Sequence, residues 1–237
     1  MKNLLVVFLI ASGLTAFGQE TMFNDKNAAV RNVSGFNAIK VSGSIEVHLA
    51  QGNTEAVAVS ASEEKFRDKI KTEVVNGTLR IYYDGDKINF STTNKKLKAY
   101  VSFKNIEALE ATGASDLKIS GTLKANTLRV NLSGASDLDG SLNVSDLKIT
   151  ASGASDTKIK GSVTNLDIEA SGASDVKGYD LTVDNCNAKA TGASDIYLTV
   201  NKLLSAHASG ASSVFYKGDA VMKEVHTSGA SSVGKKS

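Results

Sequence analysis

The chain has 237 residues, and its hydrophobic content of 41% is that of a folded globular protein, which excludes a wholly disordered chain. Its 27 Lys and Arg residues nearly balance 25 Asp and Glu residues, and only four of the basic residues are Arg, so it lacks the basic face of a nucleic-acid-binding protein. Average usage predicts about a dozen prolines, yet there are none, which indicates a fold that uses nearly every backbone N–H.

Residues 1–18 have the pattern of a secretory signal peptide, with Lys2, an apolar run at 4–10 and the small-x-small sequence A-F-G at 16–18. The apolar run is shorter than the ~20 residues that span a bilayer, so we expect cleavage before Gln19 and no transmembrane segment in the mature chain. The protein is then exported to the periplasm, the outer-membrane surface or the extracellular medium. Residues 19–32 are polar and aperiodic, which predicts a flexible lead-in.

One β-helix domain is predicted over residues 33–237, with irregular N-terminal coils at 33–108. The segment 35–49 alternates apolar and polar residues around a Ser-Gly-Ser sequence and is predicted to begin the helix. A short helix carrying Phe66 and Ile70 is predicted after Ser62. The sequence V-N-G-T at 75–78 joins two alternating runs and predicts a tight hairpin.

Seven repeats at 109–237 organise the rest of the chain. Each contains Gly-Ala-Ser-Asp or Gly-Ala-Ser-Ser, and successive copies are 18 to 21 residues apart; their glycines are Gly113, Gly134, Gly153, Gly172, Gly192, Gly210 and Gly229. A period near twenty with period-2 alternation predicts one β-solenoid coil per repeat. Each unit divides into three short segments, so the predicted fold is all-β, a single-stranded right-handed parallel β-helix with about 20 residues per coil.

Aligned repeats predict columns of inward-facing side chains. Leu128, Leu147, Leu166, Cys186 and Leu204 each stand six residues before a repeat glycine. Cys186 is therefore predicted to be a small core residue rather than a reactive thiol. Coils that hydrogen-bond to the coil on either side leave few positions where proline is tolerated.

These motifs resemble a known family, the autotransporter adhesins with a head GIN domain, which is common in Bacteroidetes. The resemblance runs from about Val33 to Val233 through the segments at 35–52 and 75–83 and the Gly-Ala-Ser-Asp array. It implies an exported right-handed β-helix and supplies no catalytic residues.

A column of carboxylates follows the repeat motif at Asp116, Asp137, Asp156, Asp175 and Asp195. If they project in register, their repulsion must be offset. One candidate is Ca²⁺, which binds several hard oxygens. The favoured alternative is a structural role, in which each Asp accepts backbone N–H bonds at a corner with help from Lys118, Lys158 and Lys177, and no cofactor is required.

Seven serines share the position after Gly-Ala: Ser115, Ser136, Ser155, Ser174, Ser194, Ser212 and Ser231. A catalytic serine needs one general base beside one hydroxyl, whereas seven equivalent serines predict a hydrogen-bonded structural ladder in a narrow corner. No catalytic residue is predicted.

His207 and His226 stand three residues before adjacent repeat glycines and are expected to be neighbours on an outer face. Two imidazoles at that spacing are a candidate Zn²⁺ site. Because no third ligand is evident in the sequence, a coincidence of surface residues is the favoured interpretation.

The favoured functional hypothesis is a non-enzymatic adhesin or binding module at the cell envelope. Its candidate partners are a cell-surface polysaccharide or a protein. A sugar site would have to use Tyr82, Tyr83, Tyr197, Phe215 or Tyr216, because aromatics are only 6% of the chain. The alternatives are a polysaccharide-degrading β-helix enzyme and a structural envelope protein that associates through its solenoid ends.

Overall fold

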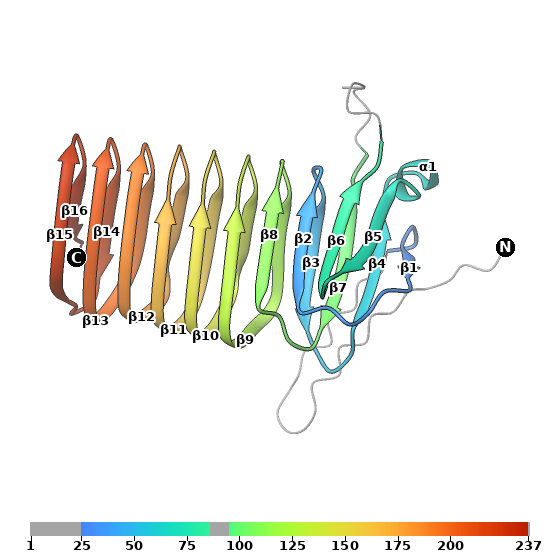
Figure 1. Ribbon diagram of the computed structural model, residues 1–237, viewed down its shortest axis with the longest axis horizontal. Helices are drawn as coiled ribbons and strands as arrows, with labels where there is room; N and C mark the ends of the chain where they lie inside the picture. Colours follow the sequence, from blue (N-terminus) through green and yellow to red (C-terminus); the bar gives the residue numbers. More distant parts are fainter. Residues whose placement is uncertain (1–24, 86–94, 237) are drawn as a thin grey trace.

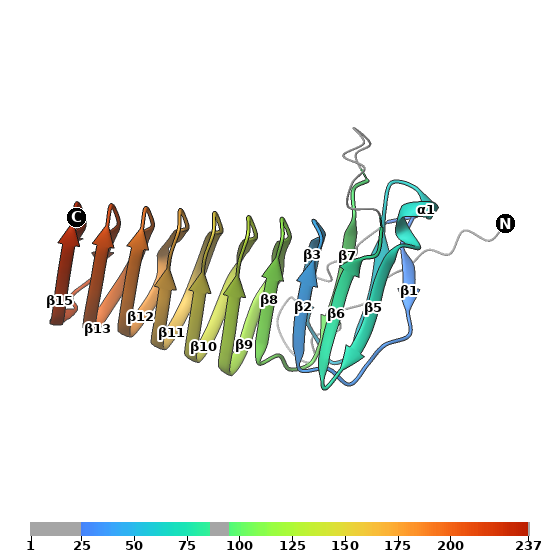
Figure 2. The same ribbon diagram turned by 45° about the horizontal axis from the view of Figure 1, so that its top comes forward.

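The computed structural model describes residues 25–85 and 95–236, which form a rod of stacked β-coils (Figures 1 and 2). The described part of the chain is nearly all β, with 69% of its residues in strands, and it forms a β-solenoid of about 7 turns with roughly 19 residues per turn. The predicted fold class is confirmed. No helix in the described ranges is long and apolar enough to cross a membrane.

Five long strands form the regular part of the rod. They are β9 (Asp116–Leu132), β10 (Asp137–Ala151), β11 (Asp156–Ala170), β12 (Asp175–Gly192) and β13 (Asp195–Gly210). Each pairs in parallel with the next, and the repeats are in register, as in the pairs Leu147 with Leu166 and Ile149 with Ile168. Alternation of buried and exposed residues is interrupted twice in β9, near 121 and near 126, so the strand bends twice and each turn has three faces.

The third corner of each turn is the Gly-Ala-Ser sequence between consecutive long strands. The backbone N–H of Ala154 donates to the carbonyl oxygen of Gly134 one turn earlier at 2.7 Å, and the same bond recurs at other repeats. Gly153 has φ +80° and lies so close to the previous turn that a Cβ would be 2.3 Å from the Gly134 oxygen. Strands and corners therefore continue one backbone ladder along the rod, which leaves little room for proline.

The N-terminal turns are not stacked in chain order. The turn formed by β2 (Ala38–Ser42) and β3 (Glu46–Gln51) lies between two later segments. On one side β2 and β3 pair in parallel with β6 (Thr78–Tyr83) and β7 (Lys98–Phe103). On the other side they pair with β8 (Ala108–Thr112) and β9. The chain thus builds its second turn first and the outermost turn afterwards (Figure 1).

Antiparallel strands cover the N-terminal end. β5 (Ile70–Val75) pairs with β6, and β4 (Ala56–Ser60) pairs with β7. The hairpin predicted at 75–78 is confirmed, with Asn76 and Gly77 at φ 51° and 73°. The predicted short helix is α1 (Glu64–Arg67), which carries Phe66 but ends before Ile70, the first residue of β5.

The flexible lead-in expected at 19–32 needs correction for its described part. Ala29–Arg31 forms β1, which pairs antiparallel with the outer edge of β4. This strand has only three residues, which is too short to show periodicity in the sequence. It forms because it pairs with the otherwise open edge of β4. Residues 19–24 and the predicted signal peptide at 1–18 lie outside the described residues.

The C-terminal end is built differently. β14 (Ser213–Lys217) and β15 (Val221–Gly229) pair in parallel with β13, and β16 (Ser232–Lys235) pairs with β14. Most residues of β15 are exposed. Val221 is 65% exposed and Val225 is 44% exposed. Among the described residues, no antiparallel strand covers this end.

Candidate functional site

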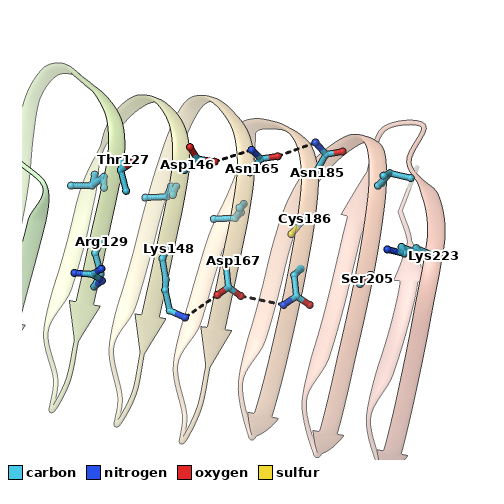
Figure 3. A pocket seen from close by; sticks show the side chains of 15 residues that line it. Thr127, Arg129, Asp146, Lys148, Asn165, Asp167, Asn185, Cys186, Ser205 and Lys223 are labelled. Atoms are coloured by element: carbon cyan, nitrogen blue, oxygen red, sulfur yellow. Dashed lines mark hydrogen bonds and ion pairs between the residues drawn. The ribbon is translucent and has the colours of Figure 1, made fainter.

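A groove of about 440 Å³ runs along one corner of the rod, across the turns formed by β9 to β13 (Figure 3). We call it the ladder groove, since hydrogen-bonded polar side chains follow both of its sides. Its floor is the inward column Leu128, Leu147, Leu166 and Cys186. These four side chains are at most 6% exposed, whereas Leu203, which also lines the groove, is 45% exposed, so a ligand reaches apolar as well as polar groups.

One side of the groove is a row of carboxylate and amide groups. Asn165 Nδ2 donates to Asp146 Oδ1 at 2.8 Å, and Asn185 Nδ2 donates to Asn165 Oδ1 at 3.0 Å. These residues are paired in the register of β10, β11 and β12. An asparagine side chain has two N–H donors and two acceptor lone pairs, and Asn165 uses one of each along the row. Its second N–H and its second lone pair can form hydrogen bonds with a ligand.

The other side is a second row that carries charge. Lys148 Nζ donates to Asp167 Oδ2 at 2.9 Å, and Asn187 Nδ2 donates to Asp167 Oδ1 at 3.2 Å. The carboxylate of Asp167 raises the pKa of Lys148, which stays protonated. Arg129 continues this row on the preceding turn. The groove therefore offers cationic, anionic and amide groups at the spacing of the turns.

Cys186 lies in the core column, as its place in the repeat predicts. Burial raises the pKa of its thiol, with a smaller contribution from Asp167. A buried thiol that keeps its proton is a poor nucleophile.

Three of the five aromatic residues named as sugar-site candidates, Tyr83, Tyr197 and Phe215, pack on another ring or on a lysine. Tyr197 stacks on Phe215 with ring centroids 5.8 Å apart, and Tyr179 contacts Tyr197 edge to face at 5.4 Å. Lys95 covers the ring of Tyr83, and Tyr216 is 8% exposed. Carbohydrate stacking needs an open ring face, so these contacts make the aromatic residues a weaker candidate for a sugar-binding site than the ladder groove.

The carboxylates after Gly-Ala-Ser form a column in register, with Asp116 opposite Asp137 and Asp175 opposite Asp195. Several have partners. Asp137 Oδ1 accepts the backbone N–H of Asp156 at 3.1 Å, and Lys177 Nζ lies 3.4 Å from Asp156 and 3.8 Å from Asp175. Lys118 instead pairs with Glu46, at 3.3 Å. These contacts lower the repulsion around Asp137, Asp156 and Asp175.

The repeat serines line the buried side of the Gly-Ala-Ser corner. Six of the seven are fully buried, namely Ser115, Ser136, Ser155, Ser174, Ser194 and Ser212, whereas Ser231 in the last turn is partly exposed. The hydroxyl of Ser155 donates to the carbonyl of Ser152 at 2.9 Å and accepts the backbone N–H of Ser136 at 3.4 Å. Each hydroxyl is occupied by backbone groups, which leaves it unsuited to nucleophilic attack.

The two histidines of the repeat are brought together and joined by a third residue. His207 on β13 is paired in register with His226 on β15, and their ring centroids are 4.7 Å apart. Glu224 lies on the same face, with Oε1 2.8 Å from His226 Nε2. Glu224 is not among the residues predicted from the sequence, although it stands two residues before His226, and strand alternation places residues so spaced on the same face.

A parallel solenoid with a groove that crosses several turns belongs to the repeat proteins, whose stacked units present extended surfaces. A family model described as "Putative auto-transporter adhesin, head GIN domain" matches residues 35–220. The chain belongs to this family, as the sequence motifs indicate.

Solved structures share the fold. A putative adhesin from Bacteroides fragilis NCTC 9343 has a TM-score of 0.81 at 19% identity, covering 88% of this chain and 96% of its own. A putative lipid binding protein from Parabacteroides distasonis ATCC 8503 has a TM-score of 0.67 at 20% identity, covering 89% and 97%. A putative adhesin from Parabacteroides merdae ATCC 43184 also scores 0.67, at 18% identity over 89% and 95%. No curated protein matches the chain.

Proposed function

We propose that this protein is an exported, non-enzymatic binding module of the cell envelope, an adhesin that holds an extended polysaccharide along the ladder groove. The observation that carries the proposal is the groove itself, where two rows of hydrogen-bonding groups repeat from turn to turn. Family membership supports the adhesin class.

A polysaccharide fits this groove because its chemistry also repeats. Sugar hydroxyls donate and accept hydrogen bonds, and the exposed amides and carboxylates of the groove offer both functions. Successive turns are separated by the ~4.8 Å of neighbouring β-strands, so hydrogen-bonding groups recur at this interval along the groove. Many weak contacts in register then add up along a polymer, as they do in multivalent binding.

The direct test is binding to an array of neutral and acidic glycans, compared between the wild-type protein and the double variant Asn165→Ala, Asn187→Ala. Both side chains are exposed, so the fold should persist, and we expect a loss of at least about tenfold in affinity from two hydrogen-bonding side chains. Lys160→Ala, on a different face of the rod, is the matched control and should bind as wild type.

Equal binding by the double variant and the wild type would reject the groove as the site. New reducing ends or unsaturated products in the same glycan samples would reject the non-enzymatic assignment in favour of a polysaccharide-degrading enzyme.

A second candidate function, self-association, is favoured by the C-terminal end. Leu203, Val221 and Val225 are 45%, 65% and 44% exposed there, and the outer edge of β15 pairs with no strand among the described residues. Sedimentation velocity over a range of concentrations tests it. A strictly monomeric protein at high concentration would exclude this function and leave the groove proposal untouched.

A further inference from the structure

The strongest unassigned cluster of side chains lies on the last two turns, away from the floor of the ladder groove. His207, Glu224 and His226 each offer one ligand atom, and all three atoms lie within 4.8 Å of one another. In residues 25–85 and 95–236 this is the one group of three or more such residues close enough to share an ion.

The backbone holds these side chains on one outer face. Glu224 and His226 are two residues apart on β15, and residues so spaced on a strand project to the same side. His207 is their neighbour on β13, where it lies opposite His226. The three positions are thus fixed by two hydrogen-bonded strands rather than by a loop.

The geometry points to a binding site for a zinc-type divalent transition-metal ion, held by His207, Glu224 and His226. Zn²⁺ binds imidazole nitrogen and carboxylate oxygen at about 2.0–2.2 Å, so two of its ligands in a tetrahedral site are at most about 3.6 Å apart. The present separations come within this limit after small rotations of exposed side chains, since His226 and Glu224 are 62% and 54% exposed. Two nitrogen ligands favour such an ion over Ca²⁺, which prefers oxygen.

The neighbouring surface leaves room for a fourth ligand. A hollow of about 350 Å³ adjoins both imidazoles. Lys189, which precedes His207 in the same column, is directed to Glu169 by an ion pair of 2.8 Å. Water, or a group from a bound partner, can complete the tetrahedron that three protein ligands leave open.

A bound metal ion would join the last turn of the rod to the turn before it. Its ligands come from β13, which is well packed, and from β15, which is almost wholly exposed. An ion that binds only when both strands are in place stabilises the folded last turn by mass action. The inference is independent of any ligand in the ladder groove.

Isothermal titration of the untagged protein with ZnCl₂ tests the site. We expect one ion per chain for the wild type and affinities at least about tenfold weaker for His226→Ala and for Glu224→Gln, because loss even of groups supporting a metal ligand costs about 10–100-fold. His48→Ala is the matched control, as His48 also contacts a glutamate, Glu46 at 2.7 Å, but stands on the N-terminal turns. It should bind Zn²⁺ as the wild type does.

A second measurement tests whether the metal ion stabilises the last turn. In hydrogen exchange followed by mass spectrometry, Zn²⁺ should slow exchange of the peptide covering 221–229 in the wild type and in His48→Ala, but not in His226→Ala. Circular dichroism of each variant establishes that it is folded.

Absence of Zn²⁺ binding to the wild type would overturn the proposal. So would unchanged affinity in both folded site variants, or an equal loss in His48→Ala, since each would place the ion elsewhere.

Discussion

The Gly-Ala-Ser corner brings backbones of successive turns closer than a side chain permits. At Gly153 two requirements coincide, a left-handed φ of +80° and a neighbouring carbonyl oxygen 2.3 Å from where a Cβ would lie. Gly121 shares the first requirement, with φ +76°, but has no atom within 4 Å of its missing Cβ. This pair separates the cost of backbone conformation from the cost of crowding.

We expect Gly121→Ala to lower the free energy of unfolding by about 1–2 kcal/mol, the cost of a left-handed conformation for an L-residue. Gly153→Ala should lower it by more, because the alanine must also push apart two hydrogen-bonded turns. Urea denaturation of the two variants measures the difference. Equal losses in the free energy of unfolding would show that the backbone at the corner can move to accommodate a Cβ at little cost.

Asp116 is the first carboxylate of its column, and its pKa is raised. Partial burial, followed by the nearby charge of Asp137, raises its pKa. A raised pKa in the folded state means that ionised Asp116 destabilises the fold at neutral pH, and that this cost is relieved as the pH falls through the folded-state pKa.

Asp116→Asn should therefore raise the thermal midpoint at pH 7, with a gain that shrinks as the pH falls toward about 4, where an aspartate becomes protonated. Thermal unfolding of both proteins from pH 3 to pH 7 measures this. A pH-independent gain would assign the effect to packing rather than to charge.

At the scale of elements, side-chain rows join strands that the backbone already pairs. Asn165 on β11 takes part in both directions, as donor to Asp146 on β10 and acceptor from Asn185 on β12. Cross-strand pairs of this kind contribute roughly 0.2–1 kcal/mol each, and directly opposed like charges destabilise.

Asn165→Asp is the informative change in this row, because it replaces a donor by a second carboxylate opposite Asp146. We expect a loss of about 1 kcal/mol in low salt and partial recovery in 0.5 M NaCl, where repulsion between exposed charges is screened. Asn165→Ala, which removes the bonds without adding charge, should show no such recovery. Identical salt responses would refute a charge-based effect.

The repeat made the regular turns predictable. Each inward column, including Cys186, could be placed by counting from a repeat glycine, because side chains alternate strictly between core and solvent. The ladder groove was not predictable in this way, since Asp146, Asn165 and Asn185 differ in type and gain meaning only from cross-turn register. Antiparallel pairing of β1 and β4, which depends on contacts remote in sequence, was also out of reach.

For the whole molecule, the two ends of the rod differ. The N-terminal end is covered by β5, β4 and β1, whereas β15 lies at the other end with one edge unpaired among the described residues. In a solenoid each turn is stabilised chiefly by its neighbours, so a turn with one neighbour is the first to open.

Without added metal, we expect amide exchange to be fastest in the peptide covering 221–229 and slowest in β10 and β11, with β5 and β6 close to the slow end. Native-state hydrogen exchange measures this order. Uniform protection along the rod would show that the turns unfold as a single cooperative unit.

The position of the β2 and β3 turn between two later segments has a consequence for how the rod assembles. This turn has both neighbours only when residues 98–103, 108–112 and 116–120 are in place. From β9 to β13, each turn pairs with the turn that precedes it in the sequence, so the turns follow one another in a single direction along the axis. Among the described residues, those before β10 therefore form a unit with one covered end and one open end, and we expect the later turns to assemble from the open end toward the C-terminus.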